Sequence, residues 1–392
     1  MNAVVEFRNV DIIFGDQPAA ALAMLDQGAG RAEILEKTGN VLGCAGANLT
    51  VNEGEISVLM GLSGSGKSTL LRAVNLLNVP SRGNVFVNAG GRVIDVAHCD
   101  AATLRNIRQH NVAMVFQQFA LLPWRTVEEN VGLGLELAGV QEAERRTRVA
   151  KQLKLVGLDQ WAKKYAHELS GGMQQRVGLA RAFATEAPIL LMDEPFSALD
   201  PLIRVRLQDE LLVLQRKLNR TIIFVSHDLD EALKIGTRIA IMEGGEIVQV
   251  GTPQEIVLKP SSDYVRAFVA HMNPLNVLRA QEVMIPFERL PGDGAEGVAR
   301  IGPQLTLSQA GEVRHAGEVL PTAALENLSE APEKAAIAIS RATPLRALID
   351  ARLNHSGPFL VRDGETICGV VRDEELFRCL HQAPEAPVSE LA

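Results

Sequence analysis

The glycine-rich run Gly61–Thr69, with the sequence GLSGSGKST, constrains the fold of this chain more than any other feature. It follows the apolar stretch Ile56–Met60 and precedes the helical pattern Leu70–Leu77. A strand, a glycine loop and a helix in that order form the context that a phosphate-binding loop requires. Glycines let backbone N–H groups turn toward phosphates without an obstructing Cβ, and the helix N-terminus attracts anions. The run therefore predicts a nucleoside triphosphate site rather than an incidental turn.

The residue types in this loop suggest how the nucleotide is held. Lys67 is expected to reach the β- and γ-phosphates, and the Ser68 hydroxyl to ligate Mg²⁺. The other residues of the loop expected to bind the nucleotide are Gly61, Ser63, Gly64, Ser65, Gly66 and Thr69.

Two acidic residues end a second apolar run, Ile189–Met192. In a parallel sheet such a run buries itself and delivers Asp193 and Glu194 at its carboxyl end, beside the glycine loop. Asp193 is expected to hold Mg²⁺ through water, and Glu194 to polarise the attacking water. The alternative interpretation is a solvated acidic strand end, which the glycine loop upstream disfavours.

A third segment, LSGGMQQ at Leu169–Gln175, precedes the helical pattern Arg176–Ala184. Small residues again open a helix N-terminus, which predicts a second anion site. Two helix N-termini that are both predicted to face phosphate suggest that the nucleotide is held between two copies of the chain.

Composition and charge limit the possible partners. No apolar run approaches the roughly 18–20 residues of a membrane span, and the N-terminus lacks the pattern of a signal peptide, so membrane association is expected through a partner. The four cysteines lack CxxC spacing, which favours a reducing compartment. From Gln281 onward 17 Asp and Glu face 10 Lys and Arg, a net of −7 within a whole-chain net of −8. Neither part has the basic excess that nucleic acid binding requires.

Short apolar runs that alternate with helical patterns predict an α/β fold with a parallel core sheet. Val4–Val10 is expected to be an early strand and Pro18–Lys37 one helix, while Thr221–Val225 suits an interior strand. A mainly helical insertion is expected over about residues 126–185.

These motifs together resemble the nucleotide-binding subunit of an ATP-binding cassette (ABC) transporter, and the resemblance covers about residues 1–270. The matching elements occur in the family's order: Gln117 in MVFQQ resembles the Q-loop, LSGGMQQR the signature, ILLMDEP the Walker B strand, SALD (Ser197–Asp200) the D-loop, and His227 in SHD the switch histidine.

The resemblance implies an ABC-type P-loop NTPase fold, with a parallel core sheet, an antiparallel β-subdomain and a helical subdomain, plus a smaller α+β C-terminal region. It implies ATP and Mg²⁺ as cofactors, with Glu194 and His227 as catalytic residues. Gln117 would bind ATP and Mg²⁺, and Phe14 would stack on adenine unless it is a core residue. The residues implied to bind ATP held by the opposite copy are Ser170, Gly171, Gly172, Gln175 and Asp200.

A closer likeness is to the quaternary-amine importers for glycine betaine, proline betaine and choline. ILEKTG before the sheet, SALDPLIR and SHDLDEAL resemble this branch, and HMNPLNVL with the acidic tail is most similar to the choline members. The implied function is hydrolysis of ATP to power import of choline or glycine betaine across the inner membrane. The implied partners are a second copy, permease subunits and, indirectly, a solute-binding protein, at the cytoplasmic face. An importer ATPase for another small solute and a non-transport ABC ATPase are the alternatives.

Beyond the cassette, residues 271–335 are expected to form a linker and a degenerate region, and residues 336–382 a module similar to cystathionine-β-synthase (CBS) modules. Residues 383–392 are expected to be a frayed tail. The CBS-like module suits either a sensor of nucleotide or ionic strength or a domain that only packs.

Overall fold

The computed structural model describes residues 2–270, 275, 277–293 and 297–381. The chain forms two compact units, Met1–Ile256 and Val257–Ala392, which are described separately below. The expected tail 383–392 and residues 271–274 and 276 of the HMNPLNVL segment lie outside the described residues.

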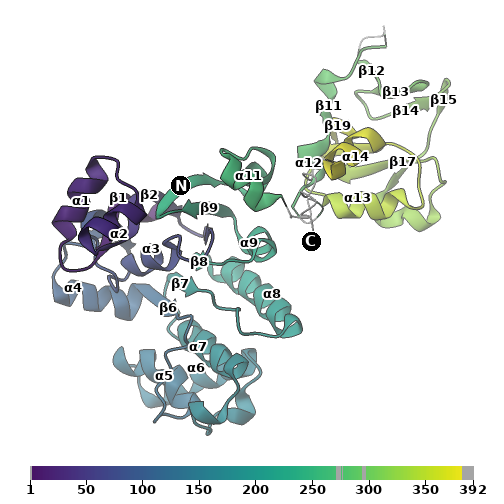
Figure 1. The fold of residues 1–392 in the computed structure, drawn as a ribbon. Helices are drawn as coiled ribbons and strands as arrows, with labels where there is room; N and C mark the ends of the chain where they lie inside the picture. The colour runs from purple at the N-terminus through teal and green to yellow at the C-terminus, as the bar shows by residue number, and fades with distance from the viewer. Residues whose placement is uncertain (1, 271–274, 276, 294–296, 382–392) are drawn as a thin grey trace, which may run out of the picture. The chain divides into compact units, whose positions relative to one another are not determined.

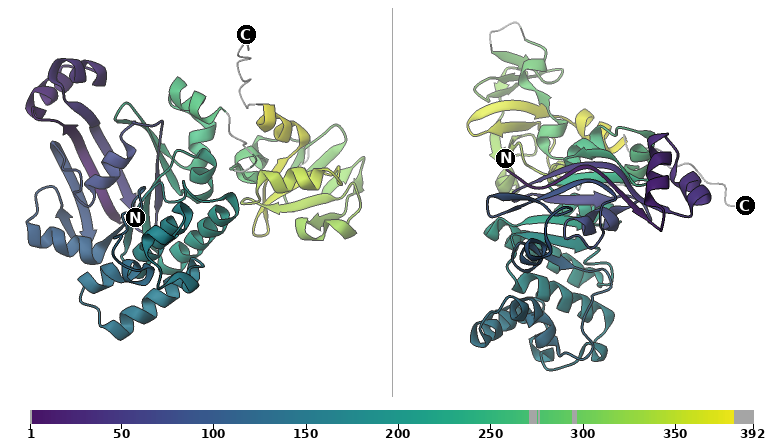
Figure 2. Two further views of the ribbon diagram at one scale, coloured as in Figure 1. Left: turned by 60° about the horizontal axis from the view of Figure 1, so that its bottom comes forward. Right: turned by 90° about the vertical axis from the view of Figure 1, so that its left-hand side faces the viewer.

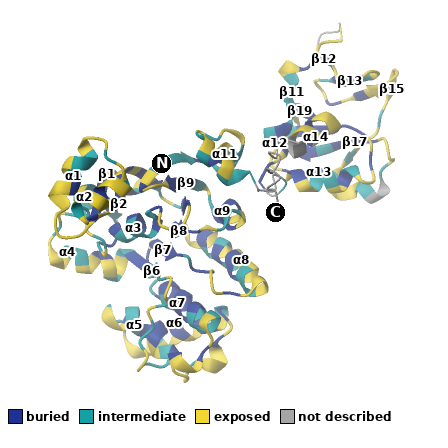
Figure 3. Cartoon of the chain, in the orientation of Figure 1, coloured by how far each residue is buried: buried dark blue, intermediate teal, exposed yellow. Residues whose placement is uncertain are grey.

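A six-stranded sheet forms the centre of the first unit (Figure 1). Five neighbouring strands run parallel, and β10 pairs antiparallel at one edge. Every residue of β3, β7 and β8 is buried, which explains why these segments are apolar runs rather than alternating ones. Figure 3 shows the buried region around β7 and β8 in dark blue. In sheet order the strands are β10 (Glu246–Gly251), β9 (Arg238–Glu243), β3 (Ile56–Met60), β8 (Thr221–Val225), β7 (Ile189–Asp193) and β6 (Val112–Val115).

A second, antiparallel sheet packs against this one, with α3 (Lys67–Ala73) sharing the core between them. Val5 and Phe7 of the antiparallel sheet belong to one buried cluster with Leu70 of α3 and Ile223 of β8. α3 therefore packs against residues of both sheets, and this packing fixes the position of the phosphate loop at the start of the helix. The strands, in sheet order, are β2 (Val41–Asn52), β1 (Ala3–Phe14), β4 (Arg82–Ala89) and β5 (Arg92–Asp95).

The single helix expected over Pro18–Lys37 is two helices in the structure, and that prediction was wrong. The helices are α1 (Pro18–Asp26) and α2 (Arg31–Thr38), separated by a short turn that contains Gly28 at φ 83°. A positive φ lies outside the right-handed helical region, so the chain breaks there.

The predicted helical insertion contains α5 (Val127–Leu137), α6 (Glu142–Leu155) and α7 (Gly171–Ala184), which group together at one end of this unit (Figures 1 and 2). Thr126 caps α5 in a reciprocal box with Glu129. The other α-helices of the first unit are α4 (Ala101–Asn106), α8 (Pro201–Leu218) and α9 (Leu229–Ile235), and α10 (Pro253–Leu258) spans the boundary between units.

The second unit is built on a five-stranded sheet whose two faces are covered differently. Alternation along β18 (Phe359–Asp363) places Phe359 and Val361 in a cluster with Leu345 and Leu348 of α13 (Leu345–Arg352). It places Leu360 in a cluster with Leu307 of β13 (Leu305–Ser308). The sheet order is β11 (Ile285–Pro286), β19 (Thr366–Val371), β18 (Phe359–Asp363), β17 (Ala336–Ser340) and β16 (Thr322–Ala324). The helices are α11 (Asp263–Val269), α12 (Ala280–Val283), α13 (Leu345–Arg352) and α14 (Asp373–His381).

The structure shows more order in the expected linker than the sequence predicted. A small antiparallel sheet lies there, and its residues Leu307 and Val313 are fully buried. Its strands have only two to four residues, too short for a recognisable alternating pattern. They are β12 (Val298–Arg300), β13 (Leu305–Ser308), β14 (Val313–His315) and β15 (Glu318–Val319).

Candidate active site

The phosphate loop joins β3 to α3, and two of its glycines are required by close backbone contacts. Gly61 has φ 143°, and a Cβ there would lie 2.1 Å from the Met242 carbonyl oxygen. Gly66 has φ 99°, and a Cβ there would lie 2.3 Å from the Gly43 carbonyl oxygen. Any other residue would displace the loop. Of the remaining loop residues expected to bind nucleotide, Ser65 is buried, Thr69 is half-buried, and Ser63 and Gly64 are exposed.

Lys67 folds over this loop. Its ammonium donates hydrogen bonds of 2.8 Å each to the carbonyl oxygens of Gly61 and Leu62. Burial lowers the pKa of Lys67, an effect that the nearby charges of Glu194 and Asp193 oppose. An anionic phosphate in the loop would favour the charged ammonium further.

Asp193 ends β7 with a fully buried side chain. The Ser68 hydroxyl donates a 2.7 Å hydrogen bond to Oδ1, and Arg72 forms a 2.8 Å ion pair with Oδ2. A buried carboxylate needs such partners, because an unpaired charge away from water is costly. Two of the three side chains predicted for Mg²⁺, Ser68 and Asp193, thus contact each other directly.

Glu194 follows in the left-handed backbone region, at φ 46°. Its N–H donates to the Val225 carbonyl of β8 at 3.1 Å, and its own carbonyl accepts from the Ser197 hydroxyl at 3.0 Å and the Gln175 amide at 3.2 Å. A non-glycine residue in such a conformation costs about 1–3 kcal/mol and persists only where its surroundings hold it. These three bonds hold the Glu194 backbone at the carboxyl end of the sheet.

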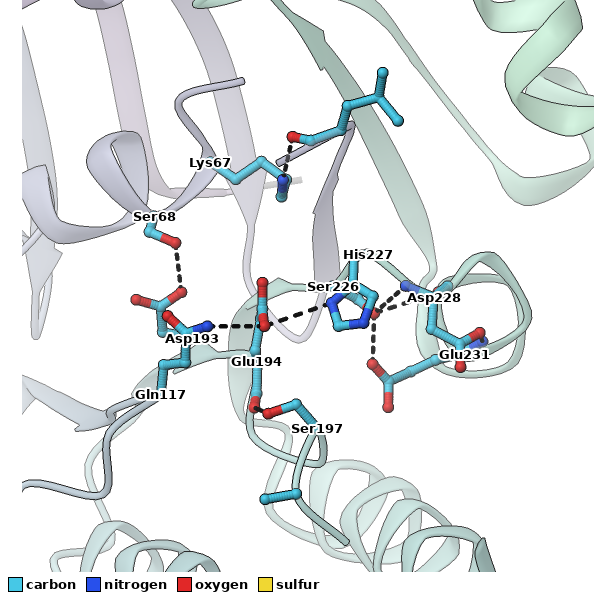
Figure 4. Close-up of polar contacts among 12 residues, drawn as sticks. Lys67, Ser68, Gln117, Asp193, Glu194, Ser197, Ser226, His227, Asp228 and Glu231 are labelled. Atoms are coloured by element: carbon cyan, nitrogen blue, oxygen red, sulfur yellow. Dashed lines mark hydrogen bonds and ion pairs between the residues drawn. The ribbon is translucent and has the colours of Figure 1, made fainter. Parts of the chain in front are cut away.

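Two further predicted residues reach the Glu194 carboxylate (Figure 4). Gln117, just beyond β6, donates from Nε2 to Oε2 at 3.0 Å. His227, just beyond β8, brings Nδ1 to 3.4 Å from the same oxygen, and 62% of its side chain is exposed. Three segments far apart in the sequence therefore converge on one carboxylate, close to the phosphate loop.

Phe14 ends β1 with 42% of the residue exposed, so it is not a core phenylalanine. A Cβ on Gly43 would lie 2.7 Å from its ring and 2.9 Å from the Thr69 methyl group. The ring therefore lies beside α3 and remains open to solvent.

The residues expected to act in trans lie at the starts of α7 and α8. Ser170 caps α7, followed by Gly171 and Gly172, and Asp200 caps α8. Gln175 differs from the expectation. It is 1% exposed, and its amide bridges the Glu194 carbonyl and the Ala198 N–H within its own chain. Both ends of the amide are occupied, so Gln175 positions the segment after Glu194 instead of facing a partner.

Sequence reasoning missed several residues that the fold brings to this site. Arg72 pairs with Asp193, and Arg31 of α2 donates a hydrogen bond to the Gly64 carbonyl of the phosphate loop. Glu231 of α9 accepts from Ser226, beside His227. The position of Glu231 four residues after His227 is a weak signal, and the pairing partners of Arg72 and Arg31 depend on tertiary structure.

Comparisons with known proteins identify the family of this chain. Residues 44–197 match the ABC transporter family. The chain is 50% identical over 303 residues to the glycine betaine/proline betaine transport system ATP-binding protein ProV of Escherichia coli (strain K12), which covers 77% of this chain and 74% of ProV. It is 48% identical over 295 residues to the glycine betaine transport ATP-binding protein OpuAA of Bacillus subtilis (strain 168), which covers 75% of this chain and 70% of OpuAA.

Solved structures show the same fold. The bacterial ABC transporter cassette MJ0796, solved as a dimer, matches with a TM-score of 0.55 and 31% identity over 64% of this chain and 98% of the cassette. A second dimeric structure of MJ0796 holds ADP and Pi in a post-hydrolysis state.

Proposed function

Because this chain belongs to the ABC transporter family as an ATP-binding subunit, we propose that it hydrolyses ATP to power import of a quaternary-ammonium solute. The observation that carries the proposal is the convergence of Gln117 and His227 on the strained, backbone-fixed Glu194. A carboxylate held rigidly near a phosphate loop is suited to orient and deprotonate an attacking water.

Mg²⁺ fits the oxygen donors at this site. The Ser68 hydroxyl and the Asp193 carboxylate already lie 2.7 Å apart, and Gln117 is the third expected ligand. No cluster of three His, Cys, Asp or Glu side chains suited to a metal exists among the residues that the structure describes. This agrees with an ion held largely by nucleotide phosphates and water, as Mg²⁺ commonly is. Bound there, Mg²⁺ would neutralise charge on the phosphates.

The functional unit in this proposal contains two copies. The exposed Ser170 and the two glycines that follow it lie at the N-terminus of α7, and helix N-termini favour anions. These residues would bind the γ-phosphate of an ATP molecule that is held by the phosphate loop of the partner copy. The dimeric cassette MJ0796 supports this arrangement. ATP binding closes the pair, and hydrolysis with phosphate release opens it.

The partner in the membrane would be a permease that contacts the helical insertion. No helix within the described part of the chain is long and apolar enough to span a bilayer. A cleft of about 800 Å³ lies against α5 and α6, and it includes Trp124, which is 71% exposed. We assign this cleft to the permease, which would hold the chain at the cytoplasmic face of the inner membrane.

For the solute we propose glycine betaine or choline. Both relatives reported above are glycine betaine transport proteins, which supports this class. To test the assignment, the tagged chain is purified from membranes of its own source, and the recovered complex is reconstituted with its solute-binding protein. We expect either solute to stimulate ATP hydrolysis, and we expect a Glu194→Gln complex to stay inactive.

Two outcomes would contradict parts of this proposal separately. Basal hydrolysis that neither solute stimulates would overturn the solute class and leave the ATPase assignment standing. Recovery of the chain with nucleic acid, without an integral-membrane protein, would favour the non-transport alternative.

A further inference from the structure

A buried carboxylate outside the predicted site, Glu231, lies behind the switch histidine. It belongs to the first turn of α9 and is 8% exposed. Burial raises the pKa of Glu231, although hydrogen bonds from Ser226 and Gln208 act in the opposite direction. The proposed hydrolytic steps use Glu194 and His227, and they assign Glu231 no role.

Glu231 fixes the turn that presents His227. Its Oε2 accepts the hydroxyl of Ser226 at 2.5 Å, and the Ser226 oxygen accepts the N–H of Asp228 at 3.0 Å. Ser226 and Asp228 flank His227 in sequence, so both ends of this short turn depend on one hydroxyl (Figure 4). A cavity of about 40 Å³ lined by Glu194, Ser226, His227 and Glu231 also brings these side chains together.

The same carboxylate joins the turn to α8. Its Oε1 accepts from Gln208 Nε2 at 3.0 Å. A second contact also joins this turn to α8. Arg204 of α8 lies 3.5 Å from the Asp228 carboxylate. Asp200 caps the N-terminus of α8 and is expected to face the partner copy. The titratable and charged groups that face Glu231 are Asp228 and Arg204, with Glu194 and His227 in the same cavity and Lys234 linked through Gln208.

We propose that Glu231 is a positioning residue: it holds His227 in place beside the Glu194 carboxylate and links the histidine to α8. The proposal rests on the proposed ATP hydrolysis. When the partner copy moves the start of α8, the Gln208–Glu231–Ser226 chain of hydrogen bonds transmits that movement to His227.

The test is a double-mutant cycle measured by single-turnover ATP hydrolysis with the full-length chain. We expect Glu231→Ala to slow hydrolysis by about 10- to 100-fold, because displacing a reacting geometry by about 1 Å has effects of this size. ATP affinity should change by less than about threefold, since the side-chain hydrogen bonds of Glu231 go to Ser226 and Gln208. Glu231→Gln, whose amide oxygen can still accept the Ser226 hydroxyl while its NH₂ group cannot accept from Gln208, should recover part of the hydrolysis that Glu231→Ala loses.

The decisive comparison is with His227→Ala. If Glu231 acts through His227, adding Glu231→Ala to His227→Ala causes no further loss. Additive losses, or wild-type hydrolysis in Glu231→Ala, would overturn the proposal. Ser226→Ala breaks the same chain at another point and replaces Glu231→Ala if that variant does not fold. Asp230→Asn, which removes an exposed carboxylate from the same first turn of α9, is the matched control and should keep full activity.

Failure of the underlying function gives a different result. A wild-type chain that hydrolyses no ATP would reject the proposed function, and the role of Glu231 with it. An active wild type with a fully active His227→Ala variant would reject the role of His227 in hydrolysis and that of Glu231 with it, and would leave the ATPase assignment standing.

Discussion

The Glu194→Gln variant is expected to bind ATP as the wild type does and to lose nearly all turnover, with kcat falling by about 10²- to 10⁴-fold. Glutamine has the shape of glutamate and can keep the backbone bonds to Val225 and Ser197, but its amide cannot accept a proton from water. The measurements are steady-state phosphate release and the Kd of a fluorescent ATP analogue.

The control for this variant removes a carboxylate elsewhere. Glu144→Gln lies on α6, where the Glu144 side chain is 53% exposed and forms an ion pair with Arg148, so hydrolysis should be unchanged. Normal steady-state hydrolysis by Glu194→Gln would exclude Glu194 as the base. Loss of ATP binding together with turnover would show that the site had been disrupted.

The second large effect is expected from Lys67. Removing its ammonium should weaken ATP binding by about 10- to 100-fold, the size of a lost hydrogen bond to a charged group. We expect this in Lys67→Ala and also in Lys67→Met, which keeps the buried apolar stem. Isothermal titration with MgATP measures the affinity, and thermal unfolding verifies that each variant is folded.

Lys217→Ala is the matched control, because Lys217 is an exposed lysine in the last turn of α8. Its ATP affinity should equal that of the wild type. Wild-type affinity in Lys67→Met would contradict the assignment of residues 61–69 to phosphate binding.

The sequence predicted the central sheet well, because three of its strands are apolar runs with strong flanking signals. β3, β7 and β8 lie where Ile56–Met60, Ile189–Met192 and Thr221–Val225 were expected. Because β7 and β8 are parallel neighbours, Glu194 and His227 both lie at the carboxyl ends of the strands. Active sites of open α/β sheets form at these ends. The ABC cassette fold is confirmed by the likeness to MJ0796.

Other features depended on contacts that no local pattern records. β6, which delivers Gln117, has only four residues and was not predicted. Gln175 was expected to face a partner copy, yet its amide is used inside its own chain, because the segment after Glu194 folds back over α7. The ion pair of Arg72 with Asp193 joins α3 to β7 across 121 residues of sequence.

The central claim is that one copy holds only part of each working nucleotide site and that a second copy completes it. The most direct measurement is a structure of the Glu194→Gln variant with trapped MgATP. The expected result is a dimer in which each γ-phosphate contacts Lys67 of one copy and Ser170 of the other. ATP enclosed entirely by a single chain, with Ser170 of every copy far from any nucleotide, would contradict the claim.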